Sequence, residues 1–172
     1  MINIEFILLV IDYFRTIKKR DFVLEWAVPF IFGIVIFQVN IGNNKVDELL
    51  KLISGNITSL LGVLIGFSVA VITILVTTNS KNIDEIKATE TEYTIGNKKQ
   101  TLFDLLLINY TYSVVIEVFL TIFNLIIPNI AAISLNHSTL NTLNTIDIFL
   151  TCHILLLTIR NTTNFYFILI KK

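Results

Sequence analysis

Four long runs of apolar residues alternate with polar stretches along the chain, and each run has the length of a membrane-spanning helix. A helix that crosses a bilayer needs about 20 mostly apolar residues. Lipid offers no hydrogen-bond partner to an open backbone, so each run is predicted to be helical. The predicted spans cover about 22–39, 57–76, 110–133 and 145–170. The pattern predicts an all-α integral membrane domain over residues 21–172, with a cytoplasmic loop at about 77–100.

The segment before the first span has a different pattern. Residues 1–20 contain a short apolar run at 6–11, which is too short to cross a membrane. Glu5, Asp12 and Lys19 recur at helical spacing and form one polar stripe. This pattern predicts an N-terminal amphipathic helix at the membrane surface. Two roles remain open for this helix, a simple anchor at the interface or a latch that docks on the bundle.

The predicted loop is polar and carries charges of both signs. A short helical continuation of the second span is expected at its start, and Gly96-Asn97 predicts a turn. Thr101 followed by Asp104 resembles a capping box with Asp in place of Glu. The third helix is therefore predicted to begin near Leu102.

The composition agrees with a membrane protein and leaves little room for catalysis. Hydrophobic residues make up 54% of the chain and charged residues 15%, against about 25% charged residues in soluble domains. One cysteine and two histidines exclude a disulfide framework and leave little for a metal site. No Gly-rich phosphate loop or HExxH motif is present. We expect no enzyme activity, no cofactor and no bound metal.

The distribution of lysine and arginine predicts the orientation. Ten of these residues lie on one side of the predicted bundle and two on the other. By the positive-inside rule both termini and the 77–100 loop are cytoplasmic. The same rule alone explains the basic residues, while contact with anionic lipid or with an anionic signal are the alternatives. The candidate basic patch consists of Arg15, Lys18, Lys19, Arg20, Lys98 and Lys99.

Two charges lie deep in the predicted spans. Glu117 follows Tyr110 by seven residues, and Arg160 precedes Tyr166 by six, so the two lie about 10 and 9 Å from the same side. The third and fourth spans are expected to be antiparallel neighbours. We therefore predict a Glu117–Arg160 ion pair, in one chain or across an interface, because an unpaired charge at this depth is costly. The pair either fixes the helix register or faces a water-filled cavity.

Polar residues also follow one face of the third span and recur on the fourth. Such groups must face protein or water rather than lipid. Either one bundle hides them, or several copies of the chain share them around an axis, as in a pore. These candidate residues are Asn109, Ser113, Thr121 and Asn124 on the third span, and His153, Asn161 and Asn164 on the fourth.

The second span carries Gly62, Gly66 and Ala70 at intervals of four. Small residues at this spacing let two helices approach closely. The face is predicted to be a helix-packing interface, within the chain or between chains, and pore lining by the same face is the alternative.

The stretches SLLGVLIGFSVAVITILVTTNSKNIDEIK and GNKKQTLFDLLLINYTYSVVIEVFLTIF resemble small four-span membrane proteins of bacterial anti-phage defence systems. The resemblance covers residues 59–123 and is greatest to the membrane effector of the Hailong system, with the Kiwa membrane subunit second. It implies a homotetrameric, channel-like effector of the bacterial inner membrane. Such an effector is held closed, partly by N-terminal helices, under the control of a partner nucleotidyltransferase and its nucleic-acid product. It assigns a role to no individual residue.

The sequence thus leads to one principal hypothesis and two alternatives. The principal one is a self-associating inner-membrane effector that lets ions through when an anionic, nucleotide or nucleic-acid, signal activates it. The first alternative is a non-conducting scaffold or sensor that recruits a soluble partner through the 77–100 loop. A small transporter subunit is the second, disfavoured because the sequence has no inverted repeat.

Overall fold

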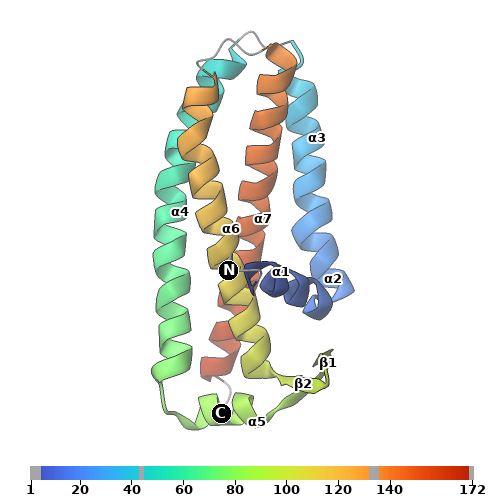
Figure 1. Cartoon of the computed structure of the whole chain (residues 1–172), viewed down its shortest axis with the longest axis vertical. Coiled ribbons are helices and arrows are strands. Elements are labelled where there is room, and N and C mark those ends of the chain that lie inside the picture. The colour runs from blue at the N-terminus through green and yellow to red at the C-terminus, as the bar shows by residue number, and fades with distance from the viewer. Residues whose placement is uncertain (1–4, 43–44, 132–135, 171–172) are drawn as a thin grey trace.

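The computed structural model describes residues 5–42, 45–131 and 136–170. Four long helical segments lie side by side, and a short N-terminal helix crosses them about midway along their length (Figure 1). In chain order the elements are α1 (Glu5–Thr16), α2 (Lys19–Phe22), the π-helical segment η1 (Val23–Ala27), α3 (Val28–Asn40), α4 (Val46–Thr77), α5 (Lys81–Ala88), β1 (Glu90–Ile95), β2 (Lys98–Thr101), α6 (Leu102–Ala131) and α7 (His137–Ile170).

The four predicted spans are confirmed as helices long and apolar enough to cross a membrane. They comprise Lys19–Asn40, Val46–Thr77, Leu102–Ala131 and His137–Ile168. Two of them begin well before the predicted positions, at Val46 and His137. Polar residues interrupt these early turns, but Val46 and Leu140 still pack in one core cluster with Ile127, so tertiary packing extends the helices beyond the apolar runs.

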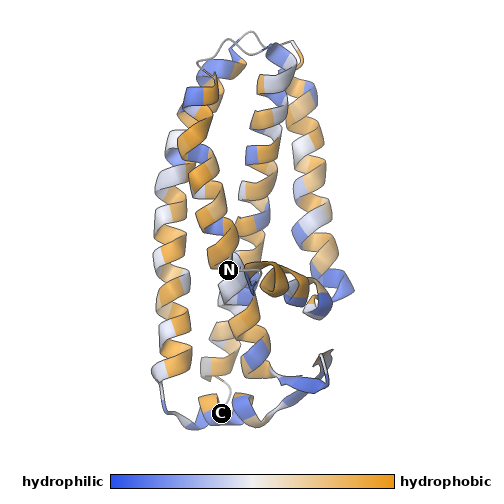
Figure 2. Cartoon of the chain, in the orientation of Figure 1, coloured by the Kyte–Doolittle hydropathy of each residue, from blue (hydrophilic) through white to orange (hydrophobic). Residues whose placement is uncertain are grey.

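The four segments do not pack in the order in which they follow one another. α4 packs against α6 and α7, while the first span, formed by α2, η1 and α3, packs mainly against α7. The two antiparallel helices α6 and α7 therefore occupy the centre of the bundle. Hydrophilic residues recur along α7, whereas α4 is hydrophobic over most of its length (Figure 2).

The loop between α4 and α6 has more structure than its sequence suggested. α5 is a separate helix, because Thr78 is extended and the Ser80 hydroxyl caps a new N-terminus by accepting the Ile83 N–H at 3.3 Å. The predicted turn is confirmed at Gly96, whose φ of 61° favours glycine. It joins β1 and β2, an antiparallel pair that was not expected.

The predicted capping box at the start of α6 is confirmed. The Asp104 carboxylate accepts hydrogen bonds from the Thr101 N–H at 3.0 Å and from the Thr101 hydroxyl at 2.9 Å. In return, the Thr101 hydroxyl oxygen accepts the Asp104 N–H at 3.1 Å. These bonds satisfy backbone donors that the first turn of a helix leaves open, and α6 begins at Leu102 as predicted.

Candidate functional site

Arg160 lies at the centre of a charged cluster between the first and last spans. Its Nε lies 2.9 Å from Oε1 of Glu25, and its Nη1 lies 3.8 Å from Oδ2 of Asp21. Its Nη2 donates a hydrogen bond of 3.2 Å to Oδ1 of Asn109. The Glu25 side chain is only 2% exposed and that of Arg160 15%, so an unpaired charge at either position would be strongly destabilising.

The predicted ion pair between Glu117 and Arg160 is wrong within the chain. Arg160 makes its ion pairs with the first span, whereas the Glu117 carboxylate accepts a hydrogen bond of 3.3 Å from Ser68 on α4. The prediction failed because Tyr110, used to count depth, is buried in the core rather than placed at the interface. The observed register puts Asn109 beside Arg160, which leaves Glu117 about two helical turns further along α6.

A proline in the first span creates a second link to α7. The carbonyl of Glu25 would normally accept a hydrogen bond from the backbone four residues on, but Pro29 has no N–H. His153 fills this gap, since its Nδ1 lies 2.7 Å from the Glu25 carbonyl oxygen. A carbonyl can only accept, so Nδ1 carries a proton, and in the neutral ring Nε2 accepts from the Tyr112 hydroxyl at 3.2 Å.

Tyr13 connects α1 to the same cluster. Its hydroxyl donates a hydrogen bond of 2.5 Å to Glu25, and its ring stacks on Tyr112 with centroids 3.7 Å apart. The Arg160 guanidinium carbon lies 6.0 Å from the centroid of the Tyr13 ring. Burial, followed by the hydrogen bond to the Glu25 carboxylate, raises the pKa of Tyr13 above its usual range. The hydroxyl therefore stays protonated and remains a donor.

The rest of α1 packs more loosely on the bundle. Tyr13 and Thr16 are its buried residues, Val10 is half-buried against the core cluster around Tyr13, and the Phe14 ring lies 5.3 Å from that of Trp26. Arg15 pairs with Asp12 on the same helix at 3.8 Å. The exposed apolar residues of α1 are Phe6, Ile7, Leu8, Ile11 and Phe14.

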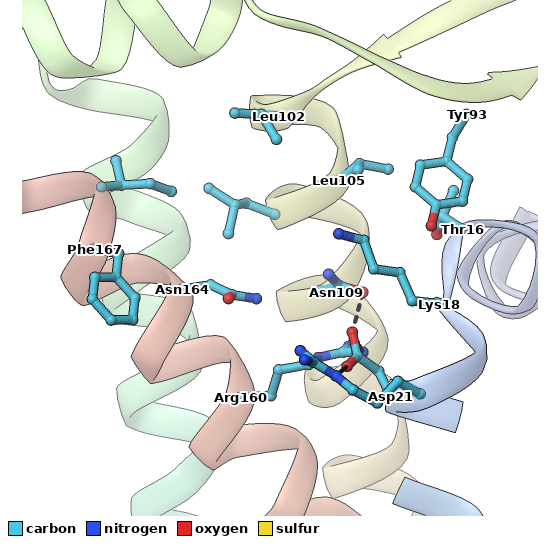
Figure 3. A pocket seen from close by; sticks show the side chains of 13 residues that line it. Thr16, Lys18, Asp21, Tyr93, Leu102, Leu105, Asn109, Arg160, Asn164 and Phe167 are labelled. Atoms are coloured by element: carbon cyan, nitrogen blue, oxygen red, sulfur yellow. Dashed lines mark hydrogen bonds and ion pairs between the residues drawn. The ribbon is translucent and has the colours of Figure 1, made fainter. Parts of the chain in front are cut away.

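A recess of about 310 Å³ opens beside Arg160 (Figure 3). It exists because the first span begins at Lys19, near the level of Arg160, whereas α6 and α7 extend further toward the α5 end (Figure 1). Hydrophobic side chains of α6 and α7 form one part of its wall, and β1 contributes Tyr93. The pKa of Tyr93 is raised, mainly by burial. The polar lining comes from Thr16, Lys18, Arg20, Asp21, Asn109, Arg160 and Asn164.

The structure brings together only part of the predicted basic patch. Lys18 and Arg20 line the recess, whereas Lys98 and Lys99 lie on β2 and do not line it. Lys99 instead lies 3.3 Å from the Glu90 carboxylate on β1. Lys19 is exposed at the start of the first span, so the basic residues do not form one continuous surface around the recess.

The predicted polar residues of α6 and α7 mostly meet inside the bundle. Asn161 donates a hydrogen bond of 3.0 Å to the Ser113 hydroxyl oxygen, and both side chains are buried. Further along, Asn124 donates a hydrogen bond of 2.8 Å to Oδ1 of Asp147. Asn164 differs from the others, since it is exposed and lines the recess.

Glu117 lies between these two contacts on α6. It is fully buried, and its carboxylate accepts from Ser68 as described above. Thr121 donates to the backbone carbonyl of Glu117 at 2.8 Å and satisfies its hydroxyl within its own helix. Within residues 5–42, 45–131 and 136–170, no lysine or arginine pairs with Glu117 or Asp147. A row of buried polar groups thus runs along the bundle with two carboxylates that lack a basic partner.

Several residues of this site were missed from the sequence. Glu25 and Asp147 are acidic residues inside apolar runs, the same signal that identified Glu117. The combination of Glu25 with Pro29 four residues later also indicates an open carbonyl that needs a partner. Tyr13 gave no comparable signal, because a tyrosine in a short apolar helix does not show which face it presents to the bundle.

The small-residue face of α4 makes no contact within the chain. Gly62, Gly66 and Ala70 are exposed, and a Cβ added at either glycine would meet no atom within 4 Å. Packing of this face against another helix of the same chain, one of the two options left open, is therefore wrong. The α4 residues that pack inside the bundle lie on the opposite side, among them Leu61, Ser68 and Val71.

These features define the class of the molecule as a helical membrane protein with four candidate spans and a buried, charged polar interior. Comparison with protein-family models, with curated proteins and with solved structures finds no match to this chain. Within the part of the chain that the structure describes, no group of three or more His, Cys, Asp or Glu residues could hold a metal ion.

Proposed function

We propose that the chain is a channel-forming membrane protein that conducts cations when activated and that α1 restrains it in the closed state. The observation that carries the proposal is the row of buried polar groups between α6 and its neighbours, in which Glu117 and Asp147 have no basic partner among the described residues. Ionisable residues inside membrane spans are rare and mark ion or proton pathways by default. Two carboxylates without basic partners favour cations over anions along this row.

The contact made by α1 supports its role as a restraint. Tyr13 inserts fully between Glu25 on the first span and Tyr112 on α6, so α1 joins two spans at the level of Arg160. Most other large apolar residues of α1 are exposed and would face lipid headgroups and acyl chains, while Val10 packs beside Tyr13. A helix whose contacts centre on one buried side chain can leave its site without disrupting the packing between the spans.

The orientation and the setting belong to the same proposal. The lysine and arginine distribution supports cytoplasmic termini, which would put the recess on the cytoplasmic side, within reach of an anionic nucleotide or nucleic-acid signal. The resemblance described above supports an effector of anti-phage defence in the bacterial inner membrane, working with a nucleotidyltransferase. Opening would then depolarise the membrane of an infected cell.

Self-association completes the proposal, with a homotetramer favoured. The exposed face of Gly62, Gly66 and Ala70 suits close contact with a second copy of α4. Four spans of one chain enclose little space, and the buried polar residues are packed against one another. A conducting path of useful width therefore requires rearrangement within the chain or a shared axis between copies.

The experiment that tests conduction is ion flux in liposomes containing the purified protein. We expect a low leak for the native chain and a larger one for Tyr13→Ala, which removes the contact of α1. Leu8→Ala is the matched control, because Leu8 is exposed on the same helix. A well-inserted Tyr13→Ala protein that passes no more ions than the native chain would contradict the latch, and absence of flux in every variant would contradict conduction.

A second candidate function is a membrane scaffold that recruits a soluble partner through the loop between α4 and α6. The observation in its favour is the ordered β1–β2 hairpin, an antiparallel pair that projects from the end of the bundle (Figure 1). Exposed edges of a small sheet accept an added strand from another protein. If the chain is such a scaffold, shortening the hairpin should abolish its activity and leave ion flux unchanged.

A further inference from the structure

Three acidic side chains, Glu25, Glu117 and Asp147, are buried at the level of the spans, and they differ in how their charge is balanced. Glu25 lies 2.9 Å from Arg160, whereas Asp147 has one hydrogen bond, from the Asn124 amide at 2.8 Å. Asp147 is fully buried, and no basic side chain of the described residues lies within ion-pair distance of it. A carboxylate in this setting requires a compensating positive charge or a proton.

The atoms around Asp147 that lack a hydrogen-bond partner are oxygens. They include Oδ2 of Asp147, Oδ1 of Asn124 and Oδ1 of Asn144, all buried. The orientation of the Asn124 amide follows from its bonds, since its nitrogen donates both to Asp147 and to the Leu120 carbonyl at 2.9 Å. If this amide were reversed, its oxygen would face the acceptor oxygens of Asp147 and Leu120. The Asn124 amide oxygen therefore points to neither and is left as a free acceptor.

These three oxygens come from side chains that are close neighbours. Asn124 is in hydrogen-bond contact with Asp147 across the interface between α6 and α7. Asn144 precedes Asp147 by three residues on α7, a spacing that puts the two side chains on one face with Cβ atoms about 5–6 Å apart. One carboxylate and two amides therefore lie at one level of the bundle, each with a buried oxygen that has no hydrogen-bond partner among the described residues.

A bound cation satisfies this arrangement better than a proton does. A proton on Asp147 would provide one donor for one oxygen, and the other free oxygens would stay unpaired in a region without water. A metal cation binds several oxygens at once, and carboxylate and amide oxygens are the ligands that hard cations prefer. A monovalent ion balances the single charge of Asp147, whereas a divalent ion would leave an excess charge in a low dielectric.

We propose that Asp147, Asn124 and Asn144 form a binding site for an alkali-metal cation such as Na⁺ between α6 and α7. The inference deepens the proposed function, because it names the class of ion and a point on its route. It is tested by binding rather than by flux, so the two proposals can fail separately. Sodium binding without ion flux would support a structural cation site and contradict conduction. Ion flux without sodium binding would support conduction and contradict the cation site.

The experiment is thermal unfolding of the purified full chain in detergent, with NaCl replaced stepwise by choline chloride at constant ionic strength. We expect Tm to rise with the logarithm of the Na⁺ concentration once this exceeds Kd, since a ligand at 100 times its Kd raises the folding equilibrium constant about 100-fold. Asp147→Asn should remove this sodium dependence. Ser54→Ala is the control, because the Ser54 hydroxyl is buried on α4 and bonds to the Lys51 carbonyl of its own helix, and this variant should keep the dependence.

A second variant keeps the test decisive if Asp147→Asn does not fold. Asn144→Ala retains the charge but removes one ligand, and it should move the sodium concentration at which Tm begins to rise at least tenfold higher. Three results would overturn the proposal. These are equal Tm in sodium and choline for the native chain, an undiminished sodium response in Asp147→Asn, and an unchanged onset of the sodium response in Asn144→Ala.

Discussion

The rings of Tyr13 and Tyr112 lie almost parallel, 2° apart in plane, with centroids separated by 3.7 Å. The two residues are far apart in the sequence, and their contact fixes α1 against α6. Parallel stacking and the full burial of both rings stabilise the contact, and the hydrogen bond from Tyr13 to Glu25 fixes the orientation of the Tyr13 side chain. Tyr13 is the largest side chain that α1 buries.

Replacing Tyr13 by alanine should therefore free α1 from the bundle. Truncating a large buried aromatic side chain costs about 3–5 kcal/mol, enough to shift the balance between docked and free helix by two orders of magnitude or more. Limited proteolysis near Lys18 and hydrogen exchange of residues 5–16 should show the release. Leu8→Ala should leave both unchanged, and equal protection in the two variants would contradict this account of the docking.

Arg160 should be far more sensitive to substitution than Glu117. Arg160→Gln leaves the buried Glu25 without its counter-charge, which costs about 3–5 kcal/mol. Glu25→Gln in the same chain should recover most of that loss, as a double-mutant cycle in folded yield or unfolding would show. Glu117→Gln should cost less, because it removes only a bond to Ser68. If Glu117→Gln, rather than Glu25→Gln, recovers the stability lost in Arg160→Gln, then Arg160 pairs with Glu117 and this account of the cluster is wrong.

The bond between His153 and the Glu25 carbonyl should depend on Pro29. His153→Ala leaves a buried carbonyl unsatisfied, at a cost of about 1–3 kcal/mol. Pro29→Ala supplies a backbone N–H that can bond to this carbonyl, so the loss from His153→Ala should be smaller in that background. The free energies of unfolding of the native chain, the two single variants and the double variant measure the coupling between Pro29 and His153. If the two single effects add strictly, the proline does not set the need for His153.

Two glycines should respond differently to leucine. At Gly66 no atom lies within 4 Å of an added Cβ, so Gly66→Leu should leave the single chain stable and disperse any oligomer built on this face. At Gly33 an added Cβ would lie 3.5 Å from Thr145 and 3.7 Å from Phe149, so Gly33→Leu should destabilise the chain itself. Measuring the size of the protein assembly in detergent separates loss of the oligomer from destabilisation of the single chain. An unchanged assembly size for Gly66→Leu would remove this face from the oligomer.

Local patterns were sufficient to predict the helical spans and the boundaries that depend on neighbours in the chain. The apolar runs predicted four spans, because a bilayer accepts only long apolar helices with internally bonded backbones. Thr101 and Asp104 fixed the start of α6, since a capping box uses residues three apart. Gly96 marked the turn of the hairpin, whereas the strand before it was missed, although Thr91, Tyr93 and Ile95 alternate with more exposed residues along β1.

Only the tertiary structure decided which polar groups meet. Glu117 and Arg160 suggested a pair by sign and apparent depth, but helix rotation turns Arg160 toward Glu25 on the first span and Glu117 toward Ser68. A register error of about two turns, or a rotation of about 100° per residue, changes the partner of every buried side chain. The amino-acid sequence by itself determines that buried charges require partners. Their identity depends on how distant helices pack, which no local periodicity encodes.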